Sequence, residues 1–208
     1  MEFLFAGRRD GKRVLIVSDS MLRGVRVGSQ FDIELVIRGG AKIRDISSNI
    51  YLTGNWNGFR NVQVVSYKFI VVHVGTNDVA DGRSIAEIAL DIRELVGVIR
   101  RFNRNAIVLV SGVLFRPLDD RVTFRKVIEA NAAMRGVCEG LPSVLFMRTY
   151  TLFKSGSTLL TQLYDRFGLH LNRDGLERVG RYLRARLARG SLKRDFALAH
   201  KTVPMMLR

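Results

Sequence analysis

The chain has 208 residues, of which 47% are hydrophobic and only 3 are proline, so it can bury one sizeable core. Its single cysteine, Cys138, excludes an internal disulfide, and no apolar run approaches the roughly 20 residues of a membrane-spanning helix. The opening apolar stretch is too short for a signal peptide, so we expect an intracellular protein, cytoplasmic or nuclear. A net charge of +15 favours contact with polyanions.

Five short apolar runs follow one another along the chain and predict buried strands. They cover residues 13–17, 33–37, 69–74, 106–110 and 143–147. These runs are continuous rather than alternating, which is typical of strands that are covered on both faces, as in a parallel sheet.

Helical patterns lie between and after these strands. Ser84 and Glu87 have the spacing of a capping box, which predicts the start of a helix. Behind this box, one helical face carries Ile85, Ile88, Ile92, Leu95 and Ile99. A second helix is predicted over residues 123–138, with Phe124, Val127 and Ile128 facing the core.

A last helix is predicted over residues 173–188, with Asn172 as its N-cap. Its apolar stripe consists of Leu176, Val179, Leu183 and Leu187. Alternating strands and helices predict an α/β three-layer sandwich with a parallel sheet of about five strands. We expect this domain to span residues 12–189, between an N-terminal extension (1–11) and a basic C-terminal tail (190–208).

Polar residues and glycines follow three of the predicted strands, and a histidine precedes the last helix. Ser20 follows the first strand, Gly40 the second and Asn77 the third, while His170 lies just before the last helix. In open parallel sheets, ligands bind beyond the carboxyl ends of the strands. Acyl transfer to water needs a hydroxyl nucleophile, a base and donors aimed at the oxyanion. Ser20, His170 and the pair Gly40 and Asn77 are of the types that supply these three parts.

Each of these residues also has an ordinary structural interpretation. A serine after a strand often caps a helix, paired glycines form turns, Asn and Asp after a glycine are common in turns, and a histidine near a helix start is often a surface residue. His73, inside the third strand, is interpreted as a core histidine, and Cys138 as a packing residue. The order of the four candidates at successive strand ends is what favours chemistry.

The four blocks resemble those of the SGNH (GDSL-type) hydrolase superfamily over most of the chain. The first block is VLIVSDSMLRG, the second RGGAKIRDI, the third VVHVGTND and the last GLHLNRDG. The third and last blocks are particularly similar to SGNH domains encoded within retroelements. The resemblance implies a flavodoxin-like fold and hydrolysis of an ester or acetyl group without a metal or cofactor. It implies Ser20 as nucleophile, His170 as base, and the Ser20 N–H, Gly40 and Asn77 as the oxyanion hole.

Two positions depart from the family pattern. Ser18 stands where the family has glycine, and Phe167 stands where it has an aspartate three residues before the histidine. Asp165 is a candidate replacement for that aspartate, whereas Asp174 is expected in the first turn of the last helix. The alternatives are a Ser–His dyad, a backbone carbonyl partner for His170, or an inactive site.

The basic charge supports a second hypothesis from another class. A domain that keeps the hydrolase fold without turnover would bind RNA or DNA through a basic surface. The candidate residues on and after the last helix are Arg178, Arg181, Arg184, Arg186, Arg189, Lys193 and Arg194. An evenly spread basic coat that aids solubility is the simpler alternative, and the sequence does not predict an oligomeric state.

Overall fold

The computed structural model describes residues 13–53 and 66–188, with the side chains of 49–53 excepted. The predicted N-terminal extension (1–11) and basic tail (190–208) lie outside the described residues, as do Arg189, Lys193 and Arg194. No helix in the described part of the chain is both long and apolar enough to cross a membrane.

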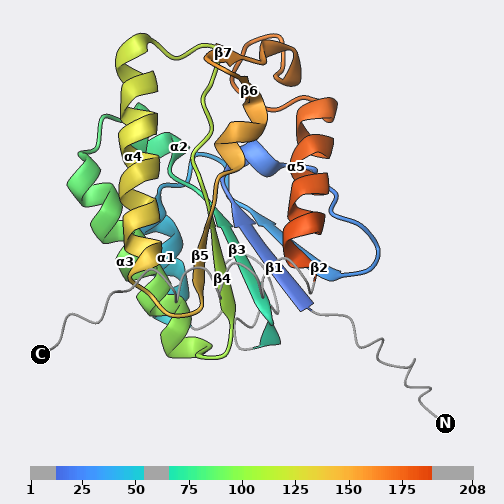
Figure 1. Cartoon of the computed structure of the whole chain (residues 1–208). Helices are drawn as coiled ribbons and strands as arrows, with labels where there is room; N and C mark the ends of the chain where they lie inside the picture. The colour runs from blue at the N-terminus through green and yellow to red at the C-terminus, as the bar shows by residue number, and fades with distance from the viewer. Residues whose placement is uncertain (1–12, 54–65, 189–208) are drawn as a thin grey trace, which may run out of the picture.

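The centre of the fold is a sheet of five parallel strands in the order β2-β1-β3-β4-β5 (Figure 1). The strands are β1 (Arg13–Ser18), β2 (Asp32–Ile37), β3 (Phe69–His73), β4 (Ile107–Ser111) and β5 (Val144–Met147). All five predicted strands are therefore confirmed to within one residue at each end. Nearly all residues of the central strands β1, β3 and β4 are buried, which explains their continuous apolar runs, whereas the edge strand β2 is only partly buried except at Val36.

Helices cover both faces of this sheet, which makes three layers (Figure 1). The helices α1 (Ile43–Thr53), α3 (Ile85–Phe102) and α4 (Arg121–Glu139) pack on one face. The other face is covered by α5 (Arg173–Leu187) and by the short 3-10 segments η1 (Ser20–Leu22) and η3 (Thr149–Phe153). The predicted α/β sandwich is confirmed.

The helix ends follow the predicted caps. The Ser84 hydroxyl accepts from the N–H of Glu87 and the Glu87 carboxylate accepts from the N–H of Ser84, so the capping box at α3 is complete. Asn172 accepts from the N–H of Gly175 at the start of α5. The predicted inward orientation of Ile128 on α4 is wrong, because its side chain is 56% exposed. The buried stripe of α4 instead passes through Val127, Ala130, Asn131, Met134 and Cys138.

Short elements complete the carboxyl edge of the sheet. They are α2 (Thr76–Ala80) after β3, the hairpin β6 (Lys154–Ser155) and β7 (Thr158–Leu159), and η4 (Thr161–Leu163). The strand order reverses direction at β1, since β2 lies on one side of it and β3 on the other. Such a switch point is where open α/β sheets hold their ligands. The segments after β1 and β3 therefore meet where a ligand site is expected.

Candidate active site

The structure brings together Ser20 and His170, which are 150 residues apart in the sequence. Ser20 begins η1 directly after β1, and His170 lies in the loop that precedes α5. Nε2 of His170 is 3.0 Å from Oγ of Ser20, within hydrogen-bonding distance. An imidazole in this position can accept the proton of the serine hydroxyl.

Asp165 lies beside the other ring nitrogen of His170. Its Oδ2 is 3.5 Å from Nδ1, which is an ion-pair distance longer than a direct N–H···O bond. Its Oδ1 accepts from the backbone N–H groups of Phe167 and Leu169 at 3.1 and 3.0 Å. The carboxylate is thus held by its own loop with one oxygen turned to the imidazole. Asp174, the other acid considered, lies in the first turn of α5.

The loop also determines the charge of this carboxylate. Partial burial raises the pKa of Asp165, but the N–H groups of Leu169, His170 and Phe167 and the nearby imidazole outweigh that effect. The pKa of Asp165 is therefore below its usual value, and the carboxylate is ionised at neutral pH. An ionised acceptor beside Nδ1 favours the tautomer whose Nε2 is free to accept a proton.

Ser18, which replaces the usual glycine, is the last residue of β1 and is fully buried. Its β-carbon leaves Ser20 within reach of His170. Phe167, which replaces the usual aspartate, is 67% exposed and points its side chain away from the protein interior.

Two expected oxyanion donors lie on the neighbouring loops. Gly40 has φ +72° in the turn after β2, a conformation that favours glycine. Asn77 uses its side-chain NH₂ to donate to the carbonyl of Ala41 at 2.9 Å, which leaves the second N–H of that group for another acceptor. In the described part of the chain, no residue accepts from the backbone N–H of Gly40 or Ser20. These groups are therefore free to donate to a ligand.

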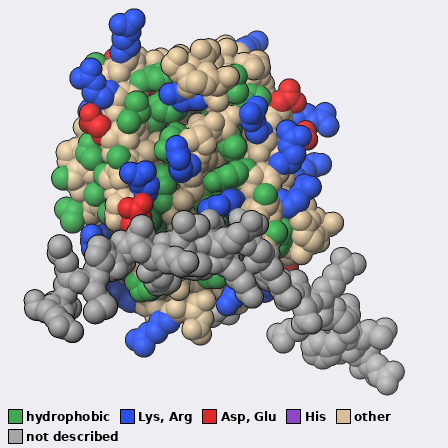
Figure 2. All heavy atoms as spheres, viewed as in Figure 1, with side chains coloured by type: hydrophobic (Ala, Val, Ile, Leu, Met, Phe, Trp, Pro, Cys, Tyr) green, Lys and Arg blue, Asp and Glu red, His purple; other side chains and the backbone are tan. Residues whose placement is uncertain are grey.

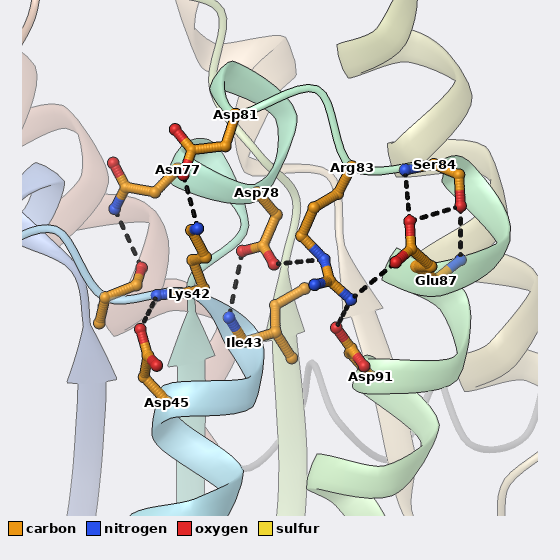
Figure 3. Close-up of polar contacts among 11 residues, drawn as sticks. Lys42, Ile43, Asp45, Asn77, Asp78, Asp81, Arg83, Ser84, Glu87 and Asp91 are labelled. Atoms are coloured by element: carbon orange, nitrogen blue, oxygen red, sulfur yellow. Dashed lines mark hydrogen bonds and ion pairs between the residues drawn. The ribbon is translucent and has the colours of Figure 1, made fainter.

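The carboxylate that follows Asn77 fastens the two loops to each other (Figure 3). Asp78 is buried, and its Oδ2 accepts from the backbone N–H of Ile43 at the start of α1. Its Oδ1 is 3.5 Å from Nε of Arg83. Burial raises the pKa of Asp78, whereas the Ile43 N–H and Arg83 lower it. Asp78 therefore links the Asn77 turn to the Gly40 turn.

Further contacts extend this network toward α3 (Figure 3). Nη2 of Arg83 lies 2.6 Å from Asp91 and 3.6 Å from Glu87. Lys42 pairs with Asp81 at 2.6 Å, which makes a second link between the loop after β2 and α2. The loops that carry Gly40 and Asn77 are thereby connected to α3 through Asp78 and Arg83.

Gly75 explains how β3 turns abruptly into α2. Its φ is +119°, and a β-carbon there would lie 2.9 Å from Cγ2 of Val113. A glycine is needed on both counts, because the left-handed conformation and the close approach each disfavour a side chain. The sequence Gly75-Thr76-Asn77-Asp78 thus begins α2 and also carries Asn77, the candidate oxyanion donor.

Two buried titratable residues lie behind Ser20. Burial raises the pKa of Asp19 to about 7, although Asp19 accepts from the N–H of Met21 at 2.9 Å. Burial lowers the pKa of His73 to about 4, and its Nδ1 lies 2.8 Å from Oγ of Ser111. The interpretation of His73 as a core histidine is confirmed. Asp19 was not identified from the sequence, and its position between two serines gave no signal of its burial.

The arginines proposed as a nucleic-acid surface are largely engaged within the chain. Nε of Arg184 donates to the carbonyl of Val27 at 2.6 Å, Arg181 pairs with Glu177 at 3.3 Å, and Arg186 stacks on Tyr182. Of these contacts only that of Arg181 is with an acid, and nothing in the described residues supports the nucleic-acid hypothesis.

A parallel α/β sandwich with a paired serine and histidine at its switch point is the arrangement of the SGNH class of hydrolases. Comparison with family models agrees, since residues 26–178 match the GDSL-like Lipase/Acylhydrolase family. The chain belongs to this family. The matched segment includes Gly40, Asn77, Asp165 and His170, while Ser20 lies just before it.

Solved structures of several esterases share the fold. The lipase Lip_vut3 from a goat rumen metagenome is 15% identical with a TM-score of 0.66, covering 84% of this chain and 96% of its own. An acetylxylan esterase of Geobacillus stearothermophilus is 14% identical with a TM-score of 0.62, covering 83% and 92%. The carbohydrate acetylesterase Est24 of Sinorhizobium meliloti is 15% identical with a TM-score of 0.60, covering 85% and 98%. A search of curated protein sequences finds no match.

Proposed function

We propose that the protein is a serine ester hydrolase that removes a small acyl or acetyl group from its substrate. The observation that carries the proposal is the distance of 3.0 Å between Oγ of Ser20 and Nε2 of His170. Family membership makes an ester the expected substrate class, and the fold neighbours include a lipase, an acetylxylan esterase and a carbohydrate acetylesterase.

In this proposal His170 takes the proton of Ser20 while Oγ attacks the ester carbonyl carbon. The tetrahedral oxyanion accepts hydrogen bonds from the Ser20 N–H, the Gly40 N–H and the free N–H of Asn77. His170 then gives the proton to the departing alcohol, which leaves an acyl-enzyme. Water, deprotonated by His170, attacks that ester and releases the acid, so Ser20 regains its proton.

Asp165 has a positioning role in this scheme. Its carboxylate favours the Nδ1–H tautomer of His170 and stabilises the imidazolium that forms during each step. The separation of 3.5 Å and the partial exposure of both side chains make this support weaker than that of a buried, directly bonded aspartate. We therefore expect turnover below that of a hydrolase with a buried triad.

The test compares wild type with Ser20→Ala in the hydrolysis of p-nitrophenyl acetate and butyrate. Loss of nearly all enzyme-dependent hydrolysis in Ser20→Ala is expected, together with wild-type rates in Ser29→Ala, an exposed serine outside the site. A fluorophosphonate probe should add one adduct to wild type and none to Ser20→Ala, measured by intact mass. Equal hydrolysis by wild type and Ser20→Ala would exclude Ser20 as the nucleophile.

A further inference from the structure

A basic groove lies between α5 and the loop that follows η1. It has a volume of about 490 Å³ and is lined by Gly24, Arg26, Arg173, Leu176 and Glu177. Gly24 and Arg26 belong to the loop, and the other three residues belong to the first two turns of α5. We call this cavity the arginine groove, since an arginine stands on each of its two walls.

The two walls of the arginine groove begin next to the proposed nucleophile and base. Gly24 is four residues after Ser20, and Arg173 is three residues after His170. Because consecutive Cα atoms are about 3.8 Å apart, the Cα of Gly24 lies within roughly 15 Å of that of Ser20, and the Cα of Arg173 within roughly 11 Å of that of His170. The contact between Ser20 and His170 holds the two starting points together. The groove is therefore within the reach of a substrate held at Ser20.

Contacts along α5 hold the loop wall in place. A β-carbon at Gly180 would lie only 2.0 Å from the carbonyl oxygen of Arg26, so the backbone of the loop packs directly on the helix. Nε of Arg184 donates to the carbonyl of Val27 at 2.6 Å, which fastens the next residue of the loop. The side chain of Arg26 is exposed and lines the groove. Its guanidinium is thus presented to the groove from a fixed backbone.

The positive charge of the arginine groove is not neutralised within the protein. In the described part of the chain, neither Arg26 nor Arg173 forms an ion pair. Glu177 lines the groove but pairs with Arg181 at 3.3 Å, and Asp174 is not among the described residues that line it. Arg173 moreover stands at the N-terminus of α5, where the helix dipole disfavours a cation. Both guanidinium groups are therefore free to pair with an anion.

The surface around the arginine groove is also basic. Figure 2 shows basic side chains gathered on the side of the molecule that α5 forms, with fewer acidic ones among them. Arg23 extends the charge toward the oxyanion loop, since its Nη2 would lie 3.4 Å from a β-carbon at Gly39, the neighbour of Gly40. A positive field around a site attracts anionic substrates in preference to neutral ones.

We propose that the arginine groove binds a negatively charged group, a carboxylate or a phosphate, on the alcohol half of the ester substrate. This inference rests on the proposed esterase function. The departing alcohol oxygen has to lie within reach of Nε2 of His170, from which it receives its proton, and one wall of the groove begins three residues after His170. A guanidinium pairs with either anion through two parallel N–H···O bonds. A volume of about 490 Å³ is within the range of cavities that hold small organic groups.

The test compares three acetyl esters that differ in the charge of the alcohol half. They are p-acetoxybenzoate, p-acetoxyphenyl phosphate and the neutral p-acetoxybenzamide, and the release of each phenol is measured. In wild type, kcat/KM for at least one anionic ester should exceed that for the neutral ester roughly tenfold, and added salt should reduce this ratio. In the double variant Arg26→Gln with Arg173→Gln, the ratio should fall to about one, because both guanidinium partners of the anion are lost.

Arg104→Gln is the control, since this exposed arginine precedes β4 at the opposite edge of the sheet. It should keep the wild-type ratio, and circular dichroism should show that all variants are folded. A ratio near one in wild type, or an equal loss in the groove and Arg104 variants, would overturn the proposal. So would a preference for p-nitrophenyl hydrogen succinate over p-nitrophenyl butyrate that the groove variant loses, because the anion would then lie on the acyl half.

A binding measurement separates this proposal from the proposed hydrolysis. Calorimetry measures p-hydroxybenzoate and p-hydroxyphenyl phosphate, the two product alcohols, with full-length Ser20→Ala, which needs no turnover. Binding that disappears when Arg26→Gln and Arg173→Gln are added supports the arginine groove even if the wild-type protein hydrolyses none of the esters. Binding that persists in that variant, or no binding of either alcohol, counts against the groove while the result with Ser20→Ala on neutral esters still decides the hydrolase proposal.

Discussion

The role of Asp165 leads to a prediction that depends on the geometry and the exposure of the site. Asp165→Asn keeps an oxygen that accepts from the Phe167 and Leu169 N–H groups, so the loop retains its conformation. The group facing Nδ1 of His170 changes from a carboxylate oxygen to an NH₂ donor. That donor favours the tautomer with the proton on Nε2, which cannot accept from Ser20.

The expected loss follows from how strongly the carboxylate acts on the imidazole. In a buried triad the same substitution lowers kcat by about 10⁴. Here the two atoms are 3.5 Å apart, and the side chains of His170 and Asp165 are 40% and 30% exposed. Solvent screens an interaction of this kind, so we expect kcat/KM to fall roughly ten- to a hundredfold.

The assay is steady-state hydrolysis of p-nitrophenyl acetate by wild type, Asp165→Asn and Asp174→Asn. Asp174→Asn serves as the control, because this acid lies in the first turn of α5 and should leave kcat/KM within about twofold. An unchanged rate in Asp165→Asn would show that His170 works with Ser20 alone or with a backbone carbonyl. A loss as large as that of Ser20→Ala would refute the argument from distance and exposure.

Four further predictions concern two buried acids near the site and two helix glycines. Asp19→Asn should raise the free energy of unfolding by about 2–4 kcal/mol at pH 8 and change it little at pH 4. Burial raises the folded-state pKa of Asp19 to about 7, so the wild-type protein loses stability as the pH rises from about 4 to 7. Urea unfolding of wild type and variant at pH 4 and pH 8 measures the difference in the free energy of unfolding. Asp78→Ala should lower kcat roughly tenfold and destabilise the fold by about 1.5–3 kcal/mol, because the N-terminus of α1 loses its buried carboxylate partner. Ester hydrolysis measures the change in kcat, and urea unfolding measures the loss of stability. Gly180→Ala should destabilise by about 3 kcal/mol or more, because the new β-carbon would lie 2.0 Å from the carbonyl of Arg26. Gly136→Ala, with open space around it, should instead stabilise α4 by about 0.5–1 kcal/mol in thermal unfolding.

The sheet was predictable because its central strands β1, β3 and β4 are buried on both faces and its edge strands β2 and β5 still carry apolar runs. A continuous apolar run leaves little doubt about a strand such as β3, where every residue from Phe69 to His73 is buried. The helix α1 was not predicted, since only Ile43 and Ile46 are apolar and buried in its first turns. The orientation of Ile128 was mistaken because the buried stripe of α4 includes Ala130 and Asn131, which periodicity of large apolar residues does not detect.

The residues of the candidate site that follow the end of a strand could be predicted from the sequence. Ser20, Gly40 and Asn77 follow successive strands, and a parallel sheet places the ends of its strands at one edge. The role of Asp78 was missed because its partner, the N–H of Ile43, is a backbone group 35 residues away that no side-chain motif encodes. The burial of Asp19 was missed for a similar reason, since it depends on how η1 packs against the sheet.

The exchange at position 167 bears on the proposed role of Asp165. A carboxylate at 165 is held to the loop by two backbone N–H groups, and this conformation turns its other oxygen toward His170. Position 167 is then released from facing the imidazole, and its side chain is 67% exposed. A phenylalanine there deprives the site of an aspartate three residues before the histidine. Restoring the family residue with Phe167→Asp should leave or raise kcat/KM for p-nitrophenyl acetate, and a loss of that rate would contradict the argument that Asp165 supports His170 from this loop.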